Sequence, residues 1–174
     1  ETDVNIHLSD DYGVNWYQAA SATWITDLKF NNTGELYGVF PNYSNSSGLY
    51  KSEDFGNNWD VEFWSDMMSA VGFDAVGNIF VGWESPAGGN EGIAIYNSMA
   101  PPPGLTFLNN GLSNTSINKI LLNPVLSSIT IFCCTDAGVY FSNDYLAGEN
   151  ENQAEIGNIS ISPNPVSDQA TFNI

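Results

Sequence analysis

Residues 52–59 read SEDFGNNW, and this stretch decides the fold because the chain carries the same signature twice. The other copy is SDDYGVNW at residues 9–16, which is 43 positions earlier. Both copies fit the pattern S-x-D-x-G-x-x-W. A repeat at this spacing is typical of proteins in which small supersecondary units stack or form a ring. The signature therefore predicts a repeat architecture and not a fold built around one core.

The signature has the chemistry of a tight turn. Serine and aspartate side chains accept hydrogen bonds from nearby backbone N–H groups, and glycine permits a positive φ at low cost. The tryptophan begins the next strand and can cover the turn with a large apolar surface. We therefore expect these residues to be structural and not catalytic. They are Ser9, Asp11, Gly13 and Trp16 in the first copy and Ser52, Asp54, Gly56 and Trp59 in the second.

The two signatures resemble the Asp-box, or bacterial neuraminidase, repeat of sialidases, sortilin-type receptors and many secreted propellers. In that family the box is a structural turn between the outer two strands of a propeller blade. The resemblance implies that each repeat of this chain is one four-stranded blade.

A second pair of segments repeats with the same spacing. Residues 30–37 (FNNTGELY) align with residues 73–80 (FDAVGNIF), and each reads as a strand, a glycine turn and a strand. Weaker third and fourth units continue the pattern, with the box serines at positions 98 and 142. We expect strands near residues 24–30, 35–40, 48–52, 59–64, 69–74, 79–83, 92–97, 105–108, 117–122, 129–134 and 138–142.

The expected fold class is all-β, a β-propeller fragment of four-stranded Asp-box blades. The alternation of Val4, Ile6 and Leu8 with polar residues indicates a half-buried strand, which would be the third strand of a blade whose inner strands are absent. The chain is thus expected to start in mid-blade. Closed propellers need at least ~4 blades, so residues 1–146 are expected to form an incomplete ring.

The C-terminal residues have a different composition. Residues 147–158 are polar and acidic, which is typical of a linker. Residues 159–174 contain Ser-Pro-Asn-Pro followed by a short strand-like segment, and they resemble the beginning of the C-terminal sorting domain of Bacteroidetes type IX secretion. That resemblance implies the first strand of an Ig-like domain, the type IX secretion machinery as a partner, and a secreted or outer-surface-attached protein.

The charge of the chain limits its partners. Twenty acidic residues face three lysines and no arginine, and the net charge is −17. Such a chain repels phosphate backbones, so we expect no nucleic-acid partner. No stretch approaches the ~20 apolar residues of a membrane span, and we expect no membrane insertion. His7 is the only histidine, and no calcium-binding loop is present, so we expect no metal and no cofactor.

Catalytic motifs are scarce. Sialidases grip the substrate carboxylate with arginines, and this chain has none. A glycoside hydrolase needs only two carboxylates. The weak candidates are Asp27 and Asp66, near the expected inner-strand entrances, although surface acids at strand ends are the favoured interpretation of both. Cys133 and Cys134 are adjacent, and successive side chains of a strand point to opposite faces. We expect one thiol in the core and no disulfide between the two.

The loops opposite the boxes are the expected binding face. Tryptophans near these loops can stack on sugar rings or grip a peptide, or can instead pack between blades. The predicted binding residues are Trp24, Asn42, Tyr43, Trp64, Trp83 and Glu84. The resulting functional hypothesis is non-catalytic binding of an extracellular glycan or protein. The alternatives are part of a secreted glycoside hydrolase and an architectural segment of a large adhesin.

Overall fold

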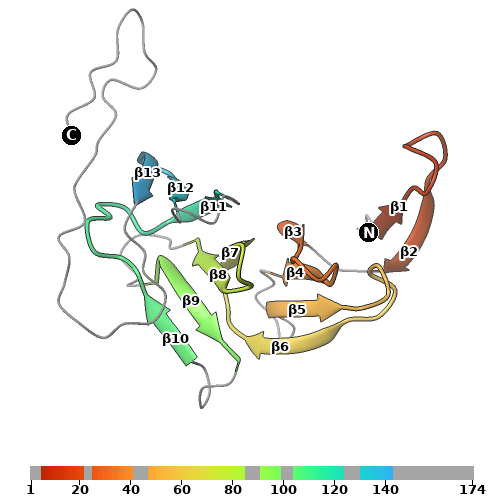
Figure 1. Cartoon of the computed structure of the whole chain (residues 1–174), viewed down its shortest axis with the longest axis horizontal. Helices are drawn as coiled ribbons and strands as arrows, with labels where there is room; N and C mark the ends of the chain where they lie inside the picture. The colour runs from red at the N-terminus through yellow and green to blue at the C-terminus, as the bar shows by residue number, and fades with distance from the viewer. Residues whose placement is uncertain are drawn as a thin grey trace, which may run out of the picture. The chain divides into compact units, whose positions relative to one another are not determined.

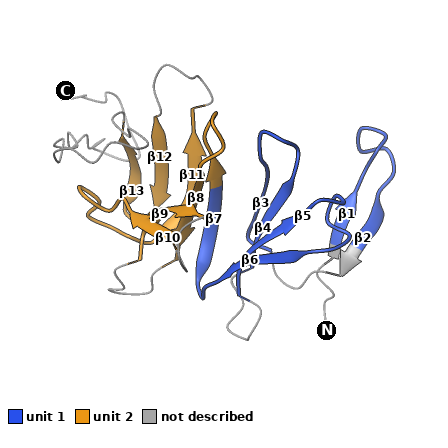
Figure 2. Ribbon diagram, turned by 60° about the horizontal axis from the view of Figure 1, so that its bottom comes forward, with its two compact units in different colours: residues 1–71 blue, residues 72–174 orange. Residues whose placement is uncertain are grey.

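The computed structural model describes residues 5–21, 25–40, 47–84, 91–98, 104–123 and 130–142. These residues form thirteen β-strands and no helix, so none of them belongs to a helix that could cross a membrane. The chain divides into two compact units, Glu1–Val71 and Gly72–Ile174 (Figure 2). The expected linker (147–158) and sorting-domain segment (159–174) lie outside the described residues.

The first unit contains one two-stranded and one four-stranded antiparallel sheet (Figure 1). In the four-stranded sheet each strand pairs with the next strand along the chain, which is the order of a meander. The strands are β1 (Asn5–Leu8) and β2 (Tyr17–Ser21), then β3 (Asp27–Phe30), β4 (Leu36–Phe40), β5 (Gly48–Ser52) and β6 (Asp60–Trp64).

The remaining strands form a four-stranded and a three-stranded antiparallel sheet, again in chain order. The boundary between the two units falls within the first of these strands. The strands are β7 (Met68–Phe73), β8 (Ile79–Trp83), β9 (Ile93–Asn97) and β10 (Gly104–Phe107), then β11 (Ile117–Leu122), β12 (Ile131–Thr135) and β13 (Gly138–Ser142).

The all-β prediction is confirmed, and the strands lie close to the expected ranges. The repeat spacing is visible in the sheets, because β3–β6 and β7–β10 have the same four-stranded meander order. The described residues form several small antiparallel sheets and do not close into a propeller ring.

Aromatic and aliphatic side chains make the core of the first unit. Ile6, Phe40 and Tyr50 are buried together, and Trp59 is packed against them. The rings of Phe40 and Trp59 meet edge to face, with their centroids 5.5 Å apart. Gly38 on β4 permits this contact, since a Cβ there would lie only 3.0 Å from the Trp59 ring. Trp59 therefore packs against the core as well as forming part of its turn.

The core of the second unit depends on a close approach between β11 and its neighbours. Ile117 and Ile120 of β11 are fully buried. A Cβ on Gly82 of β8 would lie 2.6 Å from Ile117 Cγ2, and a Cβ on Gly72 would lie 2.6 Å from Leu122 Cδ1. The missing side chains of these glycines thus create the space into which β11 packs. Each aliphatic side chain buried there contributes roughly 1.5–3 kcal/mol.

Candidate functional site

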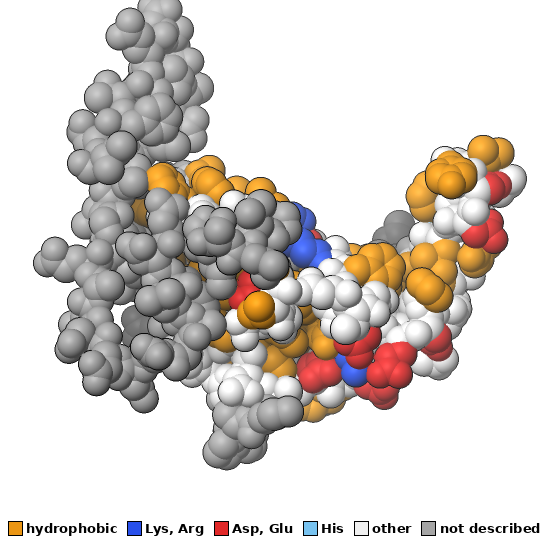
Figure 3. All heavy atoms as spheres, viewed as in Figure 1, with side chains coloured by type: hydrophobic (Ala, Val, Ile, Leu, Met, Phe, Trp, Pro, Cys, Tyr) orange, Lys and Arg blue, Asp and Glu red, His pale blue; other side chains and the backbone are white. Residues whose placement is uncertain are grey.

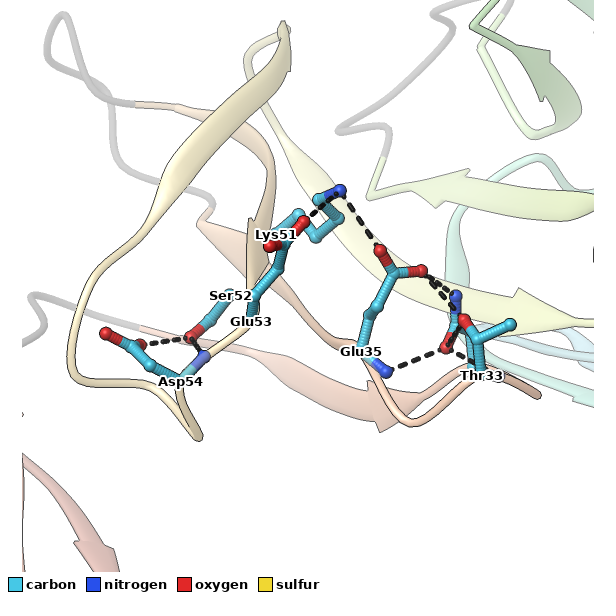
Figure 4. Close-up of polar contacts among 7 residues, drawn as sticks. Thr33, Glu35, Lys51, Ser52, Glu53 and Asp54 are labelled. Carbon is cyan, nitrogen blue, oxygen red and sulfur yellow. Dashed lines mark hydrogen bonds and ion pairs between the residues drawn. The ribbon is translucent and has the colours of Figure 1, made fainter.

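The second box turn connects β5 and β6, and the side chains of Ser52 and Asp54 form a hydrogen bond at its start (Figure 4). The Asp54 carboxylate accepts hydrogen bonds from the Ser52 hydroxyl (2.9 Å) and from the backbone N–H of Asn58 (2.8 Å). The Ser52 hydroxyl in turn accepts a bond from the Gly56 N–H (2.8 Å). Trp59 donates its indole N–H to the Gly56 carbonyl (3.0 Å). Every polar group of the signature is thus used inside the turn.

The first box turn connects β1 and β2 with the same contacts. Asp11 accepts from the Ser9 hydroxyl (2.9 Å) and from the N–H of Asn15 (2.8 Å), and the Ser9 hydroxyl accepts from Gly13 (2.7 Å). The Trp16 indole donates to the Gly13 carbonyl (3.1 Å). The two boxes also share a positive φ at their glycines, 86° at Gly13 and 88° at Gly56. The repeat therefore preserves hydrogen bonds as well as sequence.

The hydrogen bonds of the turns change the acidity of the box carboxylates. Backbone and side-chain donation from Asn58 lowers the pKa of Asp54, and the same donation from Asn15 lowers the pKa of Asp11. Each donor favours the charged form. A carboxylate with a lowered pKa and occupied oxygens is a poor general acid at neutral pH, which supports the structural role expected for both aspartates.

The sequence pattern missed the asparagine that precedes each box tryptophan. The Nδ2 atoms of Asn15 and Asn58 donate to the second oxygen of their box aspartates, at 2.6 and 2.5 Å. The presence of asparagine at the same place in both copies was the signal. A similar asparagine–aspartate pair closes the turn between β7 and β8, where Asn78 Nδ2 donates to Asp74 at 2.6 Å.

Lys51 connects the turn between β3 and β4 to the box turn between β5 and β6 through two ion pairs. Lys51 Nζ lies 3.1 Å from Glu35 Oε1 and 2.9 Å from Glu53 Oε1 (Figure 4). Hydrogen bonds to Glu53 and Glu35 raise the pKa of Lys51. The pKa of Glu35 is lowered by hydrogen bonds from Asn31, Thr33 and Lys51. Two carboxylates thus share one ammonium group at the box end of the sheet, by which we mean the end where β5 leads into β6.

Asp27, the first catalytic candidate, is buried on β3. Its Oδ2 atom accepts a hydrogen bond from the backbone N–H of Val71 (3.1 Å) and lies 3.9 Å from Lys29 Nζ. Both partners belong to the first unit with Asp27. The Asp27 carboxylate therefore accepts the hydrogen bond of a backbone N–H group of β7, which is a structural role.

Asp66, the second candidate, is exposed in the short connection between β6 and β7. Trp64, two residues earlier at the end of β6, is 59% exposed, and its ring meets the Tyr50 ring edge to face at a centroid distance of 5.9 Å. Met67, in the same connection, has a φ of 62°. An exposed indole, an exposed carboxylate and a constrained turn thus occur together, opposite the box end of the same sheet.

Of the other predicted binding residues, the structure describes Trp83 and Glu84, both in the second unit. Trp83 is 1% exposed and packs against Phe107 of the same sheet. Glu84 is exposed at the end of β8 in the second unit. Trp24, Asn42 and Tyr43 lie outside the described residues.

The cysteines of β12 show the alternation expected of a strand. Cys133 is buried, Cys134 is half-buried, and both are free thiols. Burial raises the pKa of the Cys133 thiol to about 12. Among the described residues, no three histidine, cysteine, aspartate or glutamate side chains gather in a way that could hold a metal ion.

The comparisons with known proteins found no relative. No family model matches the chain, and no match was found among the curated proteins or the solved structures.

Proposed function

We propose that this chain is a secreted or surface-attached recognition module of the Asp-box propeller type, which binds an extracellular glycan or protein without catalysis. The observation that carries the proposal is the difference between the two ends of the sheet β3–β6. At the box end, the serine, aspartate and tryptophan of the turn bond to one another. At the opposite end, an indole is presented to solvent.

Trp64 is the residue on which we place the binding role. Its ring is held from one side by Tyr50 and is otherwise largely exposed. An indole with few rotatable bonds offers a large flat contact area at low entropic cost, which suits stacking on a sugar ring or against a peptide. Asp66 and Ser65, in the adjacent connection, supply polar groups for the rim of such a contact.

The burial and hydrogen bonding of the two candidate acids favour a binding function over glycoside hydrolysis. A glycosidase needs two carboxylates that face the scissile bond. Asp27 is buried and accepts a hydrogen bond from a backbone amide, which leaves Asp66 as the exposed member of the pair. The proposal of export rests on the sequence of residues 159–174, which resembles a type IX sorting signal.

A glycan array followed by titration of the strongest hits tests this proposal. We expect Trp64→Ala to weaken binding about two- to twelve-fold, the range for loss of one aromatic contact. Trp16→Ala is the matched control, because Trp16 is 63% exposed but lies in a box turn. Equal loss in both variants, or no binding to any glycan or extracellular protein tested, would overturn the proposal. Turnover of a glycoside that Asp66→Asn abolishes would establish the hydrolase instead.

A further inference from the structure

We propose that the first unit has a docking surface for a β-hairpin of a partner, formed by the open edge of β1 and by Leu28 and Phe30 of β3. One strand of that hairpin would extend the sheet β1–β2, and its face would cover the two side chains. We call β1 and these two residues the hairpin site. The inference goes beyond the proposed function, because the hairpin site does not include Trp64.

Among the described residues, the hairpin β1–β2 covers the middle of one face of the sheet β3–β6. Ile6 of β1 is buried there with Phe40 of β4 and Tyr50 of β5. On β3, the strand beside β4, Leu28 is 40% exposed and Phe30 is 56% exposed. Hydrophobic side chains also reach the surface of the first unit in the space-filling view (Figure 3). Two large apolar side chains, two residues apart, are thus open to solvent on the strand next to a buried cluster.

The strand register places the exposed and the buried side chains on one face. Leu28 is directly opposite Gly38, and residues directly opposite each other share a face of the sheet. Phe40, two residues after Gly38, shares that face, and its ring lies 3.1 Å from the position of a Cβ on Gly38. Phe30 follows Leu28 by two residues and belongs to the same face. Its ring meets that of Phe55 at a centroid distance of 6.5 Å, which extends the exposed surface.

The second unit shows what covers the corresponding side chains of β11. Leu122 is the last residue of β11 that pairs with the next strand before the turn, as Phe30 is in β3. Ile120, two residues earlier, therefore corresponds to Leu28. Leu122 is 8% exposed and Ile120 is fully buried. Gly72 of β7 lies over both, because its Cβ would be 2.6 Å from Leu122 Cδ1 and 3.0 Å from Ile120 Cγ2. The hairpin β7–β8 thus covers in the second unit what is exposed in the first.

The edge of β1 can hold such a hairpin through backbone hydrogen bonds. By the repeat spacing, β1 and β2 take the places of β5 and β6. β5 pairs with β6 on one edge and with β4 on the other, whereas β1, among the described strands, pairs with β2 alone. In two views β1 lies nearer to β3 than β2 does (Figures 1 and 2). A strand added to β1 would therefore lie toward Leu28 and Phe30, and an open edge favours such addition.

The interface in the second unit defines the chemistry of the occupant. There β8 pairs with β9 through one edge, as the occupant would pair with β1. Gly72 and Gly82 leave the space into which the side chains of β11 pack. The occupant is therefore an apolar two-stranded segment with glycine on its inner face. A second copy of this chain fits less well, because each copy has a net charge of −17 and like charges repel.

The test is a calorimetric titration of the full chain with a synthetic peptide of residues 68–83 (MSAVGFDAVGNIFVGW), which form the hairpin β7–β8. We expect Leu28→Ser to weaken binding about three- to eight-fold, because the exposed part of this side chain would be buried in the complex. Leu121→Ser is the matched control, since Leu121 is 62% exposed on β11 in the second unit. The same peptide with Gly72→Val and Gly82→Val should not bind, although valine favours strands.

Hydrogen exchange of the β1 backbone gives a second readout. The peptide should slow the exchange of amides in Asn5–Leu8, because they would bond to the added strand. Selective weakening by Leu28→Ser, reproduced by Phe30→Ser in a chain with an unchanged circular dichroism spectrum, supports the proposal. Equal weakening in Leu121→Ser, binding of the valine peptide, unchanged exchange in β1 or the absence of binding would overturn it. A dimer that Leu28→Ser dissociates in sedimentation experiments would also overturn it, by assigning the surface to a second copy.

Discussion

Replacing Asp27 with alanine separates the structural and the catalytic roles of this residue. The substitution removes the acceptor of the Val71 N–H, and the site is buried. A buried donor left without a partner costs about 1–3 kcal/mol. The ion pair with Lys29 adds little, because its atoms are 3.9 Å apart and the lysine is partly exposed. For a chain of this length, the expected fall in Tm is about 2–12 °C.

Thermal and urea unfolding, followed by circular dichroism, measure this effect. Asp27→Asn should lose less stability than Asp27→Ala, because the amide retains an oxygen that can accept the Val71 bond. Asp66→Ala is the control; Asp66 is exposed, so its free energy of unfolding should stay within ~0.5 kcal/mol of the unmodified chain. Equal stability of Asp27→Ala and the unmodified chain would refute the structural role. Loss of glycoside turnover in Asp27→Asn without loss of stability would assign the residue to catalysis.

Three further predictions concern the turns and the thiols. The folded-state pKa of Asp54 is lowered from its ordinary 3.8, so the stabilisation is present above pH 3.8 and is lost as the pH falls through the lowered value. Asn58→Ala removes the donors that lower this pKa, so the fall in Tm below pH 3.8 should be smaller in this variant, and an unchanged profile would contradict this. Gly77 has a φ of 95° and open space around it, so Gly77→Ala should cost roughly 1–2 kcal/mol in urea unfolding. Gly48→Ala should cost more, because its Cβ would collide with the Phe63 carbonyl, and equal costs would argue against the close approach of β5 and β6. Iodoacetamide should label Cys134 in the folded chain and Cys133 only after unfolding, as peptide mass spectrometry would show, since burial raises the pKa of Cys133 to about 12.

The strands and turns were the most predictable parts of the structure. The S-x-D-x-G-x-x-W signature placed positive φ at Gly13 and Gly56, and the structure has it there. The hydrogen bonds of a box join residues at most four positions apart, so the turn chemistry is local and can be read from adjacent letters. Asn58 was missed only because the pattern left its position undefined, although the residue was the same in both copies.

The roles of the tryptophans and acids could not be predicted in the same way. Trp64 and Trp83 each end a strand, β6 and β8, yet the first is exposed and the second is buried against Phe107. Asp27 and Asp66 were equal as candidates, but the partner of Asp27 is 44 positions along the chain. Nothing near either residue in the sequence distinguishes them, because these differences arise from contacts between separate segments.

The sequence by itself therefore determined the repeat spacing, the all-β class and the hydrogen-bonding chemistry of the box turns. These properties depend on alternation, on glycine and on side chains a few residues apart, which are all short-range. Only the tertiary structure decided that Asp27 supports β7, that Trp83 is in the core, and that Phe30 and Phe55 meet at the box end. Burial and long-range pairing depend on which segments pack together, and that is a property of the whole chain.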